Sequence, residues 1–186
     1  KINEPAVRLF VQAMVHGEDG NKMSKSLGNV VDPLDAIEKY SADALRLFLV
    51  SVASPDSDFN WNDKGIQGSF KFVVKLFDFI QKLKIGKSSK RVESKINKAI
   101  KEITLDIENF KYNLAVIKIR GLLDVFEEGN EVSKKDLENF LKLISVFCPH
   151  LAEELWSKLG NKSFISLEKW AVYDEKKIDE NLEKQD

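Results

Sequence analysis

The chain has 186 residues, of which 43% are hydrophobic and 32% are charged, enough for one moderate core or a small α-rich domain with an appendage. Its 29 lysines and arginines nearly balance 30 aspartates and glutamates, so the net charge of −1 for the whole chain gives no evidence for or against a nucleic-acid partner. Any basic face must be local, and a single cysteine excludes an internal disulfide framework.

The scarcity of cysteine and histidine narrows the class of protein further. Cys148 stands alone, which favours a reducing, cytoplasmic setting, and His16 and His150 lack the spacing of zinc ligands. The apolar runs are too short for a membrane span, and no signal peptide is recognisable. Because the sequence opens on Lys1 rather than Met and stops in a charged stretch, we expect it to be a piece of a longer protein.

The first elements expected along the chain are a strand and a loop. Residues 5–16 lead into a short apolar strand, and the turn-forming residues 17–21 follow it. Residues 22–29, KMSKSLGN, are polar and predict a loop, in which Gly28 and Asn29 supply backbone freedom and loop shape.

Two short helices are expected next. Asp32 and Pro33 form a start signal, because an acidic side chain caps free N–H groups and proline suits the first helical position. This helix runs to about Tyr40, and Ser41 caps the second helix. A polar connection over residues 54–62 then leads to the longer helices.

Apolar residues at helical spacing predict a mainly α fold. The expected helices cover 63–83, 90–110, 114–128, a segment capped by Ser133, and a short segment from Pro149 to Gly160. The buried stripe predicted for the first comprises Ile66, Phe70, Val73, Val74, Phe77 and Ile80, and that for the third comprises Leu114, Ile117, Leu122 and Phe126. Such stripes bury one face each, which predicts an antiparallel helix bundle preceded by a short strand, loop and helix segment.

Three parts are therefore expected along the chain. Residues 1–62 precede the bundle, residues 63–160 form it, and residues 161–186 are a tail leading to a further C-terminal region. The tail is charged from about Asp174 and shows little apolar periodicity, so we expect it to be frayed.

The residues with the clearest chemistry lie on the predicted loop. Lys22 and Lys25 are three positions apart, with Ser24 and Ser26 beside them. A lysine ammonium is suited to phosphate oxygens, and a mobile loop can close over a nucleotide and stabilise a leaving polyphosphate. Two lysines alone also fit a solvated surface turn, so the pentapeptide by itself does not decide between these interpretations.

A longer match favours the chemical interpretation. The run GEDGNKMSKSLGNVVDPLDAIEKYSADALRLFL resembles the KMSKS signature of class I aminoacyl-tRNA synthetases. The resemblance implies that ATP, with Mg²⁺ in the whole enzyme, converts an amino acid to an adenylate that is passed to tRNA. It makes Lys25 the main catalytic residue with Lys22 in support, and assigns ATP binding to Lys22, Met23, Ser24, Lys25 and Ser26, with Met23 as an apolar anchor.

Other stretches resemble the leucine branch of the family. These are SVASPDSDFNWNDKGIQGSFKFV, ENFKYNLAVIKI and SVFCPHLAEELWSKLG, while FISLEKWAVYDE is similar to archaeal-type leucine enzymes, with Ala171 where proline is usual. The resemblance implies a fragment of an enzyme that activates leucine and charges tRNA-Leu. It makes residues 1–62 the end of a catalytic domain and residues 63–160 an anticodon-binding-type, tRNA-binding domain.

Two alternatives stay open. The isoleucine, valine and methionine enzymes share the loop, and a non-catalytic helical module that binds tRNA or a protein fits the bundle. The sequence contains no His-Ile-Gly-His-type ATP signature and no nucleotide-binding parallel sheet, so we expect the isolated chain to be inactive in adenylation.

Several other polar and aromatic residues have both a functional and a structural interpretation. We expect His150 to be a structural residue at a helix start, its ring bonded to a neighbouring helix, and Trp61 and Trp156 to be packing residues. Arg46 either braces the catalytic loop or is an ordinary surface arginine. The adjacent glutamates at 153 and 154 are expected to form a capping or salt-bridge pair in their helix's first turn.

A local cluster of positive charge runs from Lys82 into the second long helix. It comprises Lys82, Lys84, Lys87, Lys90, Arg91, Lys95, Lys98 and Lys101. Such a cluster either makes sequence-independent contacts to tRNA phosphates or is a solvated helix face.

Overall fold

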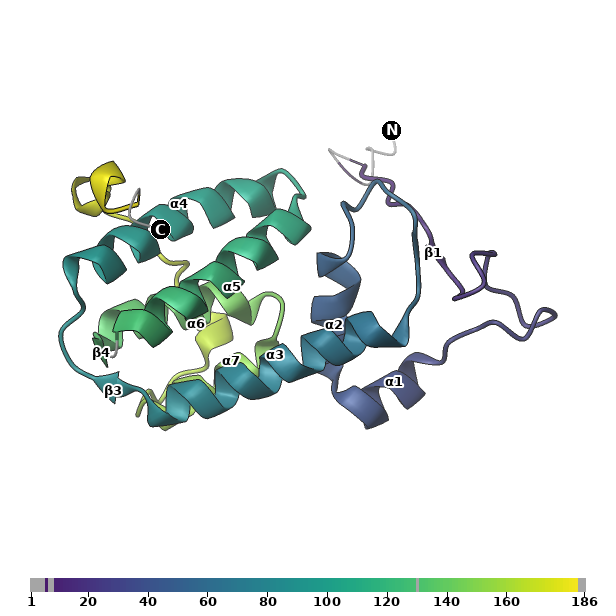
Figure 1. Ribbon diagram of the computed structural model, residues 1–186, viewed down its shortest axis with the longest axis horizontal. Coiled ribbons are helices and arrows are strands. Elements are labelled where there is room, and N and C mark those ends of the chain that lie inside the picture. The colour runs from purple at the N-terminus through teal and green to yellow at the C-terminus, as the bar shows by residue number, and fades with distance from the viewer. Residues whose placement is uncertain (1–5, 7–8, 130, 184–186) are drawn as a thin grey trace, which may run out of the picture.

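The structure is a computed structural model that describes residue 6, residues 9–129 and residues 131–183. Part of the lead-in predicted over residues 5–16 lies outside the described residues. The bundle consists of α3 (Asp63–Lys82), α4 (Lys90–Glu108), α5 (Tyr112–Gly129), α6 (Lys134–Ser145) and α7 (Pro149–Lys158). Figure 1 shows these helices gathered at one end of the molecule, which confirms the mainly α fold.

A smaller unit precedes the bundle and carries the loop. It contains β1 (Val15–His16), α1 (Pro33–Tyr40), α2 (Ala42–Ser51) and β2 (Phe59–Asn60). Helix α3 runs from beside α1 and α2 to the far end of the bundle, so it belongs to both units (Figure 1).

Two short parallel strand pairs hold together segments outside the helices. In the first, β1 pairs with β2 in the register Val15–Phe59 and His16–Asn60. In the second, β3 (Lys84–Ile85) pairs with β4 (Glu131–Val132). The pairing of residues 59–60 was not expected in a segment predicted to be a polar connection. Pairs of two residues are too short to show a periodicity of two.

The helix starts follow the predicted local signals. The Asp32 carboxylate accepts a hydrogen bond from the Leu34 amide at 2.8 Å, and Ser41 Oγ accepts one from the Ala44 amide at 3.2 Å. Ser133 Oγ accepts one from the Asp136 amide at 3.1 Å. Each cap satisfies an N–H group that has no partner within the helix, and the predicted starts of α1, α2 and α6 are therefore confirmed.

The apolar core is divided into two clusters that share α2. The smaller contains Ala36, Tyr40, Ala44, Leu45, Phe48, Trp61 and Ile66. The larger fills the bundle and includes Leu47 of α2. Because Phe48 and Leu47 are both buried but in different clusters, α2 is packed from two sides. Trp61 and Trp156 are buried in these cores, which confirms their assignment as packing residues.

Two predicted stripes were partly wrong. In α3, Val74 is 42% exposed, and the buried face instead includes Phe72 and Leu76. In α5, Leu114 and Ile117 are 40% and 61% exposed, whereas Ala115, Val116 and Ile119 are buried. These segments are apolar at neighbouring positions, so two registers about 100° apart fit helical spacing, and packing against the neighbouring helices selects one of them.

The described part of the tail is not frayed but docked on the bundle, and from Asp174 onwards on α4. It forms three short 3-10 helices, Ile165–Leu167, Glu175–Lys177 and Glu180–Glu183. The Asp174 amide donates to Asn97 Oδ1 at 2.7 Å, and the Asp179 amide donates to Ser94 Oγ at 2.8 Å. Hydrogen bonds to polar side chains of α4 thus hold a tail that has no apolar stripe of its own. The prediction of a frayed tail was therefore wrong for the described residues.

The close crossing of α2 and α3 gives a stability prediction with an internal control. A Cβ atom added at Gly65 would lie 2.5 Å from the buried Phe48 ring, whereas one added at Gly68 would meet nothing within 4 Å. We expect Gly65→Ala to lower the free energy of unfolding by about 1–3 kcal/mol through overpacking. We expect Gly68→Ala to raise it by up to about 1 kcal/mol through helix propensity. Urea unfolding of both variants tests this, and equal effects would contradict the crossing geometry.

Candidate functional site

The loop that carries the two lysines begins at a tight turn after β1. The Gly17 amide donates to the Asn21 carbonyl at 2.9 Å, and His16 and Lys22 form an isolated antiparallel bridge. A second turn follows, in which the Gly28 amide donates to the Lys25 carbonyl at 3.3 Å. Gly28 has φ +66°, a left-handed conformation that glycine adopts without strain. The backbone therefore folds back on itself twice.

Asn29 fastens the two turns together. Its Oδ1 accepts from the Ser24 amide at 2.9 Å, and its Nδ2 donates to the Asp19 carboxylate at 3.1 Å and to the Lys22 carbonyl at 3.4 Å. One amide side chain thus contacts the first and the middle residue of the KMSKS segment and the turn before it, which gives the expected role in loop shape a specific geometry.

Asp19 is the anionic partner in this fastening. The Asn21 side chain donates to its carboxylate at 3.1 Å, in addition to the bond from Asn29. Hydrogen bonds from the Asn21 side chain and backbone and from the Asn29 side chain lower the pKa of the exposed Asp19 carboxyl below its usual value. At neutral pH Asp19 is therefore a carboxylate that accepts hydrogen bonds from the Asn21 and Asn29 side chains.

The side chains of the loop divide between packing and solvent. Met23 is half-buried against the smaller core, as an apolar anchor would be. Ser24 Oγ accepts from the Leu27 amide at 3.2 Å and lies 3.1 Å from Ser26 Oγ. Lys22 and Lys25 are exposed, and within the part of the chain that the structure describes no hydrogen bond or ion pair holds either ammonium group. The loop presents two positive charges on a braced backbone.

Metal ligands are not gathered around this loop. Among residues 6, 9–129 and 131–183, no group of three or more His, Cys, Asp or Glu side chains could hold a metal ion. The described helices likewise include none long and apolar enough to cross a membrane.

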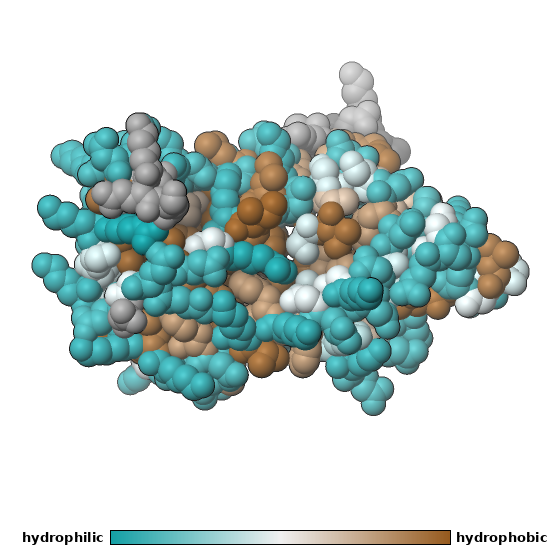
Figure 2. Space-filling view, viewed as in Figure 1, coloured by the Kyte–Doolittle hydropathy of each residue, from teal (hydrophilic) through white to brown (hydrophobic). Residues whose placement is uncertain are grey.

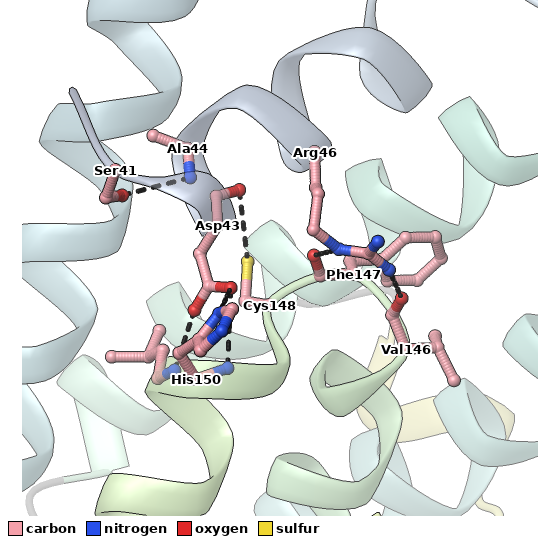
Figure 3. A network of polar contacts seen from close by, with 9 residues as sticks. Ser41, Asp43, Ala44, Arg46, Val146, Phe147, Cys148 and His150 are labelled. Carbon is pink, nitrogen blue, oxygen red and sulfur yellow. Dashed lines mark hydrogen bonds and ion pairs between the residues drawn. The ribbon is translucent and has the colours of Figure 1, made fainter. Parts of the chain in front are cut away.

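A second polar cluster joins the loop unit to the bundle. The buried Asp43 carboxylate of α2 accepts from the Leu151 amide at 2.7 Å and from His150 Nδ1 at 2.8 Å, and lies 3.4 Å from the His150 amide. Figure 3 shows the Asp43 side chain pointing at the start of α7. Helix α7 is therefore capped by a residue of another helix, and the expected structural role of His150 is confirmed.

Arg46 lies one turn further along α2 and contacts the end of α6. Its Nε donates to the Phe147 carbonyl at 3.3 Å, and a guanidinium nitrogen donates to the Val146 carbonyl at 3.0 Å (Figure 3). Both predicted alternatives for Arg46 were wrong, because the side chain neither contacts the lysine loop nor lacks contacts on the surface. Asp43 and Arg46, called the α2 clamp below, were missed because their partners are about a hundred residues away in the sequence.

The Cys148 thiol lies inside this clamp. Cys148 is buried, and its Sγ is 3.9 Å from the Asp43 carbonyl. Burial, with the nearby Asp43 charge, raises the pKa of the thiol far above its ordinary value. The thiol therefore stays protonated and has no nucleophilic role.

The two glutamates after His150 do not act as the expected pair. Glu153 accepts from the Ile165 amide at 2.9 Å and from the Ser166 amide at 3.2 Å, so it caps a turn of the tail rather than its own helix. Glu154 forms an i,i+4 ion pair with Lys158 at 3.3 Å. A long side chain near a helix start can reach a neighbouring segment, which local spacing does not reveal.

The positive cluster from Lys82 to Lys101 is partly neutralised. Lys84 and Arg91 pair with Glu131 and Glu128, and Lys101 pairs with Glu175 of the tail at 2.8 Å. The side chains of Lys82, Lys87 and Lys90 are exposed to solvent. Hydrophilic side chains cover much of the bundle in Figure 2, with hydrophobic ones in separate patches between them.

Comparison with known families accounts for most of the chain. The family model of class I tRNA synthetases (I, L, M and V) matches residues 1–62, which include the lysine loop. The family model of the anticodon-binding domain of tRNA ligase matches residues 89–186, from the start of α4 onwards. The two matches follow each other in the order loop unit, then bundle.

Curated relatives are leucine–tRNA ligases. That of Mycoplasma mycoides subsp. mycoides SC is 39% identical over 182 residues, covering 96% of this chain and 23% of the relative. That of Thermosipho melanesiensis is 39% identical over 207 residues, covering 97% of this chain and 25% of the relative. The chain thus spans about a quarter of the length of these relatives. The archaeal-type likeness of residues 164–175 stays a prediction.

The fold agrees with a solved structure of the same kind. The crystal structure of the ternary complex of Agrobacterium radiobacter K84 agnB2 LeuRS-tRNA-LeuAMS matches with a TM-score of 0.84 and 30% identity. The match covers 96% of this chain and 26% of the other. The loop unit and the bundle are therefore arranged much as in that structure.

The fastening of the loop by Asn29 leads to a prediction for amide exchange. Asn29→Ala removes the acceptor of the Ser24 amide, so we expect the Ser24 amide to exchange with solvent roughly tenfold faster. Asn21→Ala is the control, because it removes one bond to Asp19 and leaves the Ser24 amide paired. Amide exchange followed by NMR tests both, and an unchanged Ser24 amide in Asn29→Ala would contradict the role of Asn29.

Proposed function

Since the chain belongs to the class I tRNA synthetases, we propose that it is the part of a leucine–tRNA ligase that supplies the KMSKS loop and the tRNA-binding bundle. The whole protein then activates leucine with ATP and transfers it to tRNA-Leu. The observation that carries the proposal is a braced loop whose two lysines have no ion-pair partner among the described residues, in a chain whose curated relatives are leucine–tRNA ligases.

Lys25 is the main catalytic residue in this proposal, and Lys22 supports it. Adenylation breaks the bond between the α- and β-phosphates of ATP, and negative charge builds on the departing pyrophosphate. An ammonium group that forms no ion pair with any residue that the structure describes can meet that charge without first breaking such a pair. Lys22, Met23, Ser24, Lys25 and Ser26 then form the loop's part of the ATP site, with Met23 and the serines fixing its shape.

We expect Mg²⁺ to bind together with ATP, through the nucleotide's phosphates. Magnesium usually binds through substrate phosphates and one or two carboxylates rather than a dedicated protein cage. The described residues contain no cluster of three or more potential ligands. We therefore assign Mg²⁺ to the ATP phosphates, and the lysines add positive charge to the same oxygens.

The bundle holds tRNA in this proposal. The similar solved structure is a complex with tRNA, and the family model over residues 89–186 is an anticodon-binding domain. The exposed cations Lys82, Lys87 and Lys90 are suited to phosphate contacts that do not depend on sequence. A protein with these substrates and a single buried thiol fits the cytoplasm, where tRNA is charged.

Amino-acid-dependent ATP–pyrophosphate exchange by the whole synthetase tests the proposed substrate. We compare leucine, isoleucine, valine and methionine. Exchange driven by leucine is the expected result. Exchange driven by one of the other three would move the protein to that branch, and none with any of them would favour a non-catalytic module that binds tRNA or a protein.

The role of Lys25 gives a separate prediction. Lys25→Ala in the whole synthetase should lower the rate of adenylation by a factor of roughly 100 or more, because it removes a charge aimed at the transition state. The affinity for tRNA should change less than about twofold. Lys64→Ala, which removes an exposed lysine of α3, is the control and should leave both unchanged. Equal losses of adenylation and tRNA affinity in Lys25→Ala would count against the phosphate role.

The tRNA contacts of the bundle can be tested through salt dependence. The double variant Lys82→Ala, Lys87→Ala should weaken tRNA binding and reduce the slope of log affinity against log salt concentration by roughly 1.5 to 2. The double variant Lys39→Ala, Lys64→Ala removes the same charge from the loop unit and the start of α3. If both pairs change the slope equally, the effect is one of net charge and not of a phosphate site.

A further inference from the structure

The α2 clamp lies between the two parts of the chain to which the proposed function gives different tasks. The lysine loop acts on ATP, and the bundle holds tRNA. We propose that Asp43 and Arg46 are positioning residues that set the angle between these parts, so that tRNA held by the bundle reaches the adenylate formed at the loop. This inference rests on the proposed function and deepens it.

The path from the loop to the clamp is short and closely held. Helix α1 begins at Pro33, four residues after Asn29, and α2 follows it after Ser41 alone. Ser41 has φ 100°, an unusual conformation for a residue other than glycine, and its hydroxyl caps α2. Tyr40, Phe48 and Ile66 pack α1, α2 and the start of α3 into one small core. A change in the direction of α2 is therefore passed to the segment that carries the lysines.

At the other end, the clamp holds the turn between α6 and α7. Asp43 approaches the start of α7, where backbone N–H groups are unpaired and the helix dipole favours an anion. Arg46 approaches the end of α6, where carbonyl groups are unpaired and the dipole favours a cation. Asp43 and Arg46 carry opposite charges one helical turn apart, and each contacts the helix end whose dipole favours its charge. The pair therefore fixes the orientation of α2 relative to α6 and α7.

Apart from the continuous helix α3, the other side-chain contacts between the two parts do not fix the angle so closely. Leu47 of α2 packs into the bundle core, and Phe10 stacks on Phe110 at a centroid distance of 4.5 Å. Apolar contacts of this kind are non-directional and tolerate small rotations. Hydrogen bonds weaken steeply when their angles change. The angle between loop unit and bundle is therefore set by the clamp together with α3, the continuous helix that runs through both units.

The experiment compares two activities of the whole synthetase in the variant Asp43→Asn. ATP–pyrophosphate exchange needs the loop but not tRNA, whereas aminoacylation needs both. We expect exchange to stay within about twofold, and kcat for aminoacylation to fall by roughly tenfold to a hundredfold at saturating tRNA, as displacement of a reacting group by about 1 Å would cause.

Asp106→Asn is the matched control. Asp106 is also a buried carboxylate, and it pairs with Lys118 at 2.6 Å between α4 and α5, with no part in the α2 clamp. We expect it to lower stability without separating the two activities. Arg46→Gln is a second test variant, because Arg46 is exposed and its replacement should not prevent folding. It should show the same separation as Asp43→Asn.

Three outcomes can be told apart. Separation of exchange from aminoacylation in Asp43→Asn and Arg46→Gln, but not in Asp106→Asn, supports the inference. Parallel losses in all three variants would overturn it and leave the clamp a purely structural contact. Absence of leucine-dependent exchange in the unmodified synthetase would instead overturn the proposed function.

Discussion

The loop unit and the bundle are joined where one carboxylate is buried between the helices α2 and α7. Asp43 is 4% exposed, and a charge so far from water is stable only when donors surround it. The start of α7 supplies them through the Leu151 amide and the His150 side chain. Because the same helix places Phe48 in one core and Leu47 in the other, this interaction lies where the loop unit and the bundle are joined.

The lysine loop combines a fixed backbone with free charges. Asn29 and Asp19 hold the two turns of the loop, so its shape does not depend on a ligand. The exposed ammonium groups of Lys22 and Lys25 form no ion pair within the described ranges. An ion pair there would have to be broken whenever phosphate arrived. A loop braced by an amide rather than by its own lysines therefore keeps its cations available for an anionic substrate.

Local signals predicted more of this molecule than long-range ones. The starts of α1, α2 and α6 were predicted because Asp32, Ser41 and Ser133 cap residues next to them. The prediction of the buried face of α5 was partly wrong, because Leu114 and Ala115 are both apolar and only packing decides which of them is buried. The strand pairs and the contacts of Arg46 were missed because no local pattern encodes a partner far away in the sequence. The roles given to the two lysines come from a family resemblance and not from their spacing.

The docked tail changes which positive charges of the bundle are open to a nucleic acid. Glu175 forms an ion pair with Lys101, and the Asp174 and Asp179 amides donate hydrogen bonds to the Asn97 and Ser94 side chains. The tail therefore covers part of the α4 surface. Lys84 and Arg91 are held by glutamates on the α5–α6 side. A phosphate would have to displace a carboxylate at each of these positions. Lys82, Lys87 and Lys90 are exposed and form no ion pair with another described residue, so under the proposed function the connection between α3 and α4 is the stronger candidate for contacts to the tRNA phosphates.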